Sequence, residues 1–112
     1  MKLYWLLLFG FIVSGCSSAP APKCASTPDL SRLTQAEQIA LKHSIRANSK
    51  NCHSSQYECA FQLTHNRSNE LVVTTSFLYP DKNSGQCVQP IGGSEINVYD
   101  SNGRFQRAVL SL

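Results

Sequence analysis

Residues 96–109, INVYDSNGRFQRAV, contain two runs of strand-forming residues joined by the turn sequence DSNG. Gly103, the last residue of that turn, can adopt the left-handed backbone conformation that a tight hairpin loop requires. The sequence therefore predicts that residues 95–99 and 104–112 form an antiparallel strand pair at the end of the chain.

Two earlier segments also predict strands. Residues 57–64 (YECAFQLT) alternate between apolar and polar side chains, and residues 71–79 (LVVTTSFLY) are rich in β-branched and aromatic residues. The breaker sequence PDKNSG at residues 80–85 precedes residues 87–91, which predict a short strand interrupted by Pro90. The expected sheet has four or five antiparallel strands.

One helix is expected before these strands. Thr34 and Glu37 have the spacing of a capping box, and residues 34–47 (TQAEQIALKHSIRA) are good helix formers without proline or glycine. Residues 48–55 then predict a polar connection. This order of elements predicts an α+β fold, in which one N-terminal helix packs on one face of the sheet.

The order of elements over residues 34–112, ending in INVYDSNGRFQRAV, resembles small cystatin-like and NTF2-like domains. The resemblance implies two layers, a helix and an antiparallel sheet, between which such domains can form a pocket. It does not assign a function, because one fold can carry many.

The first fifteen residues have the layout of an export signal. Lys2 is followed by an apolar run over residues 3–13 and then by small residues. This run is about half as long as a helix that spans a membrane. Residues 1–15 are therefore predicted to be a signal peptide.

The tetrapeptide VSGC at residues 13–16 resembles the lipobox of bacterial lipoproteins. The resemblance implies that Cys16 receives a lipid on its thiol and that signal peptidase II cleaves between Gly15 and Cys16. Acyl chains on Cys16 would attach the protein to a membrane. Ser17 stands where an aspartate would retain such a protein at the inner membrane, so we expect the outer membrane, facing the periplasm.

Residues 17–31 (SSAPAPKCASTPDLS) contain three prolines and many serines and alanines, which predicts a flexible tether. The predicted organisation is a signal peptide at residues 1–15, a lipidated cysteine with its tether at 16–33, and a globular domain at 34–112.

Four cysteines remain once Cys16 is reserved for lipid, and this even number predicts two disulfides in the oxidising periplasm. Four cysteines allow three pairings. We favour Cys59 with Cys87, both expected in or beside strands, and Cys24 with Cys52, which would join the tether to the segment after the helix.

A metal site is the rival interpretation of Cys52, His53 and Cys59, with His43 or His65 as a further ligand. Zinc sites usually contain closely spaced pairs of ligands such as C-x2-C or H-x3-H, and the sequence has no such pair. We therefore predict no metal and no other cofactor.

Composition and motifs narrow the function. After the predicted cleavage nine Lys and Arg remain against seven Asp and Glu, without a basic run, so no nucleic-acid partner is predicted. The sequence has no G-x-S-x-G, no H-E-x-x-H and no glycine-rich phosphate loop. His43, His53 and His65 are interpreted as structural or exposed, no catalytic residue is assigned, and the protein is expected not to be an enzyme.

Five aromatic residues are expected on strands: Tyr57, Phe77, Tyr79, Tyr99 and Phe105. They could form an aromatic surface on the sheet face away from the helix, which favours a protein interface, or they could complete a small core. The sequence does not assign binding residues.

These features favour a non-catalytic binding protein with a protein partner. The first hypothesis is an immunity or inhibitor protein against a toxin or cell-wall hydrolase, which suits a small disulfide-linked domain. An accessory subunit of a secretion system or pilus is the alternative. A small-ligand binder or an enzyme with a pocket between helix and sheet ranks below both.

Overall fold

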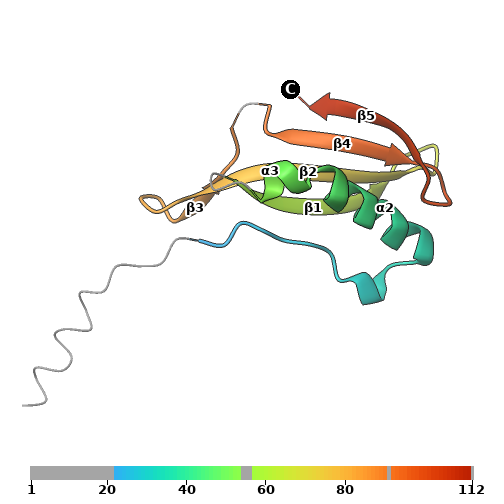
Figure 1. The fold of residues 1–112 in the computed structure, drawn as a ribbon, viewed down its shortest axis with the longest axis horizontal. Helices are drawn as coiled ribbons and strands as arrows, with labels where there is room; N and C mark the ends of the chain where they lie inside the picture. The colour runs from blue at the N-terminus through green and yellow to red at the C-terminus, as the bar shows by residue number, and fades with distance from the viewer. Residues whose placement is uncertain (1–21, 54–56, 91, 112) are drawn as a thin grey trace, which may run out of the picture.

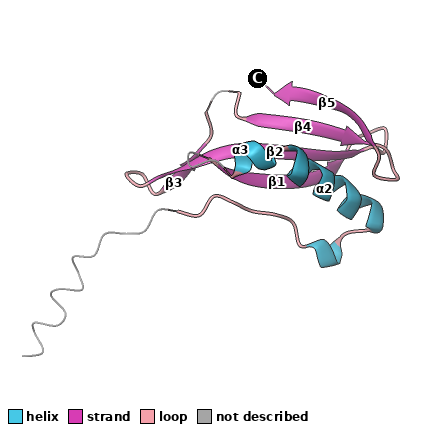
Figure 2. Cartoon of the chain, viewed as in Figure 1, coloured by secondary structure: helices cyan, strands magenta, loops and turns pink. Residues whose placement is uncertain are grey.

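The computed structural model describes residues 22–53, 57–90 and 92–111. Helices cover one face of an antiparallel sheet (Figures 1 and 2), so the predicted α+β fold with an N-terminal helix on the sheet is confirmed. None of the helices in these three ranges is long and apolar enough to cross a membrane. The predicted signal peptide, the cleavage site between Gly15 and Cys16, and the lipidation of Cys16 lie outside the described residues.

One antiparallel sheet contains all the described strands, in the order β1-β2-β4-β5. Their bounds are β1 (Glu58–His65), β2 (Leu71–Asp81), β3 (Gln86–Val88), β4 (Ser94–Tyr99) and β5 (Phe105–Ser111). The predicted hairpin of β4 and β5 is present, with Gly103 at a φ of 88°.

β2 continues beyond the position at which the sequence predicts a break. Pro80 pairs with Cys87 of β3, next to the pair between Tyr79 and Val88. The register of β1 on β2 ends at Leu78, so Pro80 has a strand partner on one side only. A proline is tolerated there, because its missing N–H is not required by a second neighbouring strand.

The main helix begins where the capping box predicts. It is α2 (Gln35–Ala47), preceded by the short η1 (Leu30–Arg32) and followed by α3 (Ser49–Cys52). The Thr34 hydroxyl accepts from the Glu37 N–H at 3.2 Å, and the Glu37 carboxylate accepts from the Thr34 N–H at 2.8 Å. α3 occupies part of the predicted polar connection, because the Asn48 carbonyl accepts from the N–H groups of Asn51 and Cys52.

The core lies between α2 and the middle of the sheet. Its buried apolar side chains are Ala40, Leu41, Leu71, Val73 and Tyr99. Buried polar side chains continue this layer toward α3, and each has a hydrogen-bond partner. They are Ser44, Asn48, Thr75 and Asn97. The centre of the interior, between α2 and the middle of the sheet, is therefore packed.

The segment before α2 lies along the outer edge of β1 (Figure 1). The Ser26 N–H donates to the Cys59 carbonyl and the Phe61 N–H donates to the Ser26 carbonyl. The N–H groups of Cys24 and Ala25 donate to Glu58. These contacts extend the packed part of the chain to Cys24, ahead of the domain start predicted at residue 34.

The prediction of two disulfides is confirmed, but the pairing that we favoured is wrong. The bonds join Cys24 to Cys87 and Cys52 to Cys59. Cys52 ends α3 directly over the start of β1, with its Cα 5.3 Å from that of Cys59. The N-terminal segment instead runs along β1 to the end of the sheet, where β3 carries Cys87.

Candidate binding surfaces

The aromatic residues lie on the helix-covered face of the sheet. Of the two alternatives that the sequence left open, an aromatic surface on the opposite face is therefore wrong. Alternation along β2 places Phe77 and Tyr79 on the same side as Val73, which packs in the core. Tyr99 is buried beneath α2. The middle of the opposite face carries β-branched side chains, namely Val72, Thr74, Ile96, Val98 and Val109.

Two exposed residues and a half-buried histidine form a patch where α2 meets the β4–β5 hairpin. Phe105 and Ile39 are each 46% exposed. The His43 ring stacks on Phe105, with ring centroids 5.2 Å apart and an interplanar angle of 27°. We call Ile39, His43 and Phe105 the distal patch.

Gly103 allows the hairpin to approach the helix this closely. A Cβ atom at Gly103 would lie 2.7 Å from the Ala36 carbonyl oxygen and 3.1 Å from the Cβ atom of Ile39. Its φ of 88° is also unfavourable for residues with a side chain. The turn and the distal patch are therefore held together by backbone contact.

A buried hydroxyl, that of Tyr99, contacts the His43 side chain of the distal patch from inside the domain. The Nδ1 atom of His43 lies 2.7 Å from the hydroxyl oxygen of Tyr99, which also contacts the Ser44 hydroxyl. Burial raises the pKa of Tyr99, so the hydroxyl keeps its proton. This contact holds the imidazole in one orientation on the surface.

Three cationic residues lie close to the distal patch along the chain. Lys42 and Arg46 on α2 and Arg104 in the hairpin are exposed. None of the three forms an ion pair with a described carboxylate. Aromatic and arginine side chains are enriched in protein interfaces, and the arrangement suits the binding of a protein surface.

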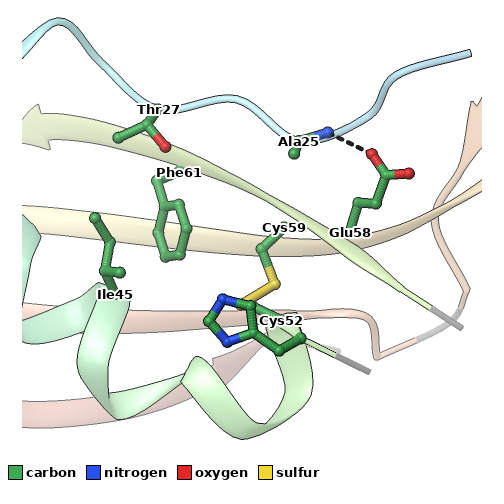
Figure 3. A pocket seen from close by; sticks show the side chains of 8 residues that line it. Ala25, Thr27, Ile45, Cys52, Glu58, Cys59 and Phe61 are labelled. Atoms are coloured by element: carbon green, nitrogen blue, oxygen red, sulfur yellow. Dashed lines mark hydrogen bonds between the residues drawn. A yellow bond between two sulfur atoms is a disulfide. The ribbon is translucent and has the colours of Figure 1, made fainter. Parts of the chain in front are cut away.

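A first hollow lies between the N-terminal segment, β1 and the end of α2 (Figure 3). Its volume is about 270 Å³, and it is lined by Ala25, Thr27, Ile45, Cys52, His53, Glu58, Cys59 and Phe61. Glu58 is the carboxylate in this wall, and one of its oxygens already accepts two backbone N–H groups at 2.9 and 3.0 Å.

This hollow offers a histidine and a carboxylate to a small ligand. Acid–base chemistry requires such groups to be free to exchange a proton with a substrate. The two backbone donors hold Glu58 in a structural role, and no hydrogen bond joins it to His53 among the described residues. The rest of the wall consists of Thr27, the disulfide between Cys52 and Cys59, and apolar side chains.

A second hollow of about 270 Å³ lies at the other side of α3, lined by Asn51, Tyr57, Phe77, Pro90, Gly92 and Gly93. Tyr57 contacts Tyr79 across the strands, with ring centroids 6.4 Å apart. Tyr79 is 40% exposed. This aromatic hollow is at the end of the sheet that carries β3.

The three histidines considered as metal ligands or catalytic groups in the sequence lie at three separate places in the structure. His43 belongs to the distal patch, His53 borders the first hollow, and His65 pairs with Glu37 at 2.9 Å. The Thr34 N–H and then His65 hold the pKa of Glu37 below its usual value. In residues 22–53, 57–90 and 92–111 no three His, Cys, Asp or Glu side chains could share a metal ion.

That the protein binds no metal or cofactor and is not an enzyme remains a prediction from the sequence.

The sequence places Ile39 and His43 on one helix face but does not indicate that Phe105 joins them, because hairpin and helix meet only in the tertiary structure.

No protein-family model matches the chain, and no curated protein or solved structure matches it either.

Proposed function

We propose that this protein is a lipid-anchored, non-catalytic binding protein of the outer membrane that inhibits a soluble periplasmic enzyme, as an immunity or inhibitor protein. The distal patch is the single observation that carries the binding part of the proposal. It combines two half-exposed apolar side chains, Ile39 and Phe105, with an oriented imidazole at His43.

Preorganisation makes this patch suitable for tight binding. The Tyr99 hydroxyl orients His43, and His43 in turn stacks on Phe105. Side chains that are already held in place lose little conformational entropy when a partner covers them. A small number of such residues can supply most of the free energy of binding.

The rest of the molecule agrees with binding better than with catalysis. The space between α2 and the sheet is packed, and Glu58 in the first hollow is engaged by backbone N–H groups. The anchor part of the proposal rests on the tetrapeptide VSGC at residues 13–16.

The test is affinity capture from envelope extracts with the chain from Ser17 onward, carrying both disulfides. Phe105→Ser is the variant and Val109→Ser is the matched control, because Val109 is 44% exposed on the opposite face of the sheet. Mass spectrometry identifies what is retained, and circular dichroism verifies that both variants are folded.

We expect the unaltered chain and Val109→Ser to retain one soluble enzyme, in near-equal amount and inactive while bound. Phe105→Ser should lose it. Recovery of several subunits of one assembly would favour an accessory subunit of an envelope machine instead. Equal retention by Phe105→Ser would exclude the distal patch, and an empty column would favour a small-ligand binder.

A further inference from the structure

The disulfide between Cys24 and Cys87 determines where the tether leaves the domain. Cys87 pairs with Pro80 near the end of β2, whereas β5 begins at Phe105, in line with Leu71 at the start of β2. From Leu71 to Pro80 the strand advances nine residues, which is about 30 Å at 3.3 Å per residue. The described chain therefore begins at the end of the sheet that carries β3, opposite the turn between β4 and β5 (Figure 1).

The surface at this end combines aromatic rings with lysines. Tyr79 is 40% exposed and contacts the ring of Tyr57. Lys23 precedes the disulfide, and Lys82 lies in the turn between β2 and β3. Lys50 lies in α3, next in sequence to Asn51, which lines the aromatic hollow. All three lysines are exposed. We call these five residues the tether end.

Two carboxylates near the tether end, those of Glu58 and Asp81, accept hydrogen bonds from other groups of the domain. Glu58 accepts from the N–H groups of Cys24 and Ala25. Asp81 accepts from the Asn83 N–H and from the Ser84 hydroxyl. The lysines form no ion pair with a described carboxylate, so their charges are available to an external anion.

We propose that the tether end rests on the anionic headgroups of the bilayer that holds the acyl chains of Cys16. This inference depends on the lipid anchor of the proposed function. Cys24 lies eight positions after Cys16, so a fully extended chain separates them by at most about 29 Å. The anchor thus keeps this end of the domain close to the membrane surface.

The chemistry of the tether end suits a bilayer surface. Tyrosine combines an apolar ring with a polar hydroxyl and is enriched where headgroups meet hydrocarbon. Lysine side chains are attracted by anionic lipids, an attraction that falls off within a Debye length. Tethering raises the local concentration of the membrane surface, so even weak attraction orients the domain.

In this orientation the tether end contacts the membrane and the distal patch is left for the protein partner. With Tyr79 and Lys82 on the headgroups, the distal patch is presented about 30 Å farther into the periplasm, at the opposite end of β2. A soluble partner could then reach Phe105 without contact with the bilayer.

Tryptophan fluorescence tests this orientation directly, because the chain contains one tryptophan, Trp5, which the predicted cleavage removes. Tyr79→Trp places a single fluorophore at the tether end, and Phe105→Trp is the matched control at the distal patch. The lipidated proteins are reconstituted in vesicles of phosphatidylethanolamine, phosphatidylglycerol and a phosphatidylcholine brominated along its acyl chains, and quenching by bromine is measured.

We expect quenching of Tyr79→Trp to be several-fold stronger than quenching of Phe105→Trp. Adding Lys23→Glu and Lys82→Glu should reduce it, whereas Lys42→Glu with Arg46→Glu, the matched charge reversal on the outer face of α2, should not. Replacing phosphatidylglycerol with phosphatidylcholine should also reduce it.

Equal quenching of the two tryptophan variants would overturn the proposed orientation. Flotation with the vesicles without quenching, together with loss of the captured partner in Tyr79→Ser, would assign the tether end to a protein surface instead. A protein that does not float with the vesicles lacks the anchor, so that outcome removes the proposed anchor as well as the orientation.

Discussion

The Nδ1 atom of His43 lies 2.7 Å from the hydroxyl oxygen of Tyr99, which joins a ring at the surface of α2 to a side chain with no exposed area. Tyr99 belongs to β4, and its hydroxyl also contacts Ser44. One buried hydroxyl thus connects the packing of helix on sheet to the orientation of the distal patch.

Tyr99→Phe should weaken both the fold and the distal patch. The substitution removes the hydroxyl that His43 and Ser44 share, and we expect the free energy of unfolding to fall by about 1 to 2 kcal/mol. Urea denaturation measures this change. Tyr79→Phe is the control, since it removes the hydroxyl of a side chain that is 40% exposed and should cost less than about 0.5 kcal/mol. Equal effects of the two substitutions would contradict the bridging role of Tyr99.

Gly103→Ala should destabilise the protein more than Gly85→Ala. Both glycines have a positive φ, so each substitution costs about 1 to 2 kcal/mol of backbone strain. At Gly103 the new Cβ also meets the Ala36 carbonyl oxygen at 2.7 Å, whereas Gly85 has nothing within 4 Å. Thermal unfolding of both variants compares the costs. Similar melting temperatures would mean that the hairpin is not pressed against α2.

The two disulfides should contribute unequally to stability. The bond between Cys24 and Cys87 spans 63 positions, and that between Cys52 and Cys59 spans 7. In the chain-entropy model they stabilise by about 4 and about 2.5 kcal/mol respectively. Replacing each pair by serine, followed by urea denaturation, measures both contributions. Tryptic peptides of the unreduced protein verify the pairing.

Digestion with trypsin distinguishes the three possible disulfide pairings. Cleavage after Lys50 and after Arg67 releases one peptide that contains both Cys52 and Cys59. The observed pairing predicts one peptide with an internal disulfide and a separate cross-linked pair of peptides that contains Cys24 and Cys87. Either other pairing would join all three peptides into one species.

Glu37→Gln should reduce stability at neutral pH but not in acid. The Thr34 N–H and His65 hold the pKa of Glu37 below its usual value of about 4.5. Its ionised form therefore stabilises the folded state above that value, and the contribution is lost as the pH falls through the lowered pKa. We expect a deficit of about 0.5 to 1 kcal/mol near pH 7.

Unfolding by urea between about pH 7 and about pH 3 gives the comparison between Glu37→Gln and the unaltered protein. The two curves should converge at the acid end. A deficit that is the same at every pH would mean that the charge of Glu37 does not contribute.

Cys16→Ala should abolish the lipid anchor. The variant should take up no radiolabelled palmitate in a bacterial host and should keep its signal peptide, because the thiol that accepts the lipid is missing. Ser17→Asp should remain labelled but move to the inner-membrane fraction of a density gradient. Labelling that survives Cys16→Ala would refute lipidation at this residue.

Local signals in the sequence predict the beginning of α2 and the last hairpin well. The capping box of Thr34 and Glu37 satisfies its own N–H groups, and Gly103 adopts the positive φ that its turn requires. Each signal works within a few residues, so no distant contact is needed to interpret it.

Contacts between distant segments are predicted less well. The favoured disulfides were wrong because the sequence does not indicate that residues 24–26 lie along β1, where the carboxylate of Glu58 and the backbone of β1 satisfy their N–H groups. The sequence left open whether the aromatic side chains line an exposed sheet face or complete the core, because alternation defines two faces without indicating which one the helix covers.

The sequence by itself determined the α+β class, the position of the main helix and the final hairpin, since capping and turn conformation depend on neighbouring residues. Only the tertiary structure decided that Cys24 bonds to Cys87, that Phe105 stacks on His43, and that these two features lie at opposite ends of β2. The physical reason is that packing and strand register depend on which segments of the whole chain are buried together in the core. The spacing of residues along the sequence does not specify that choice.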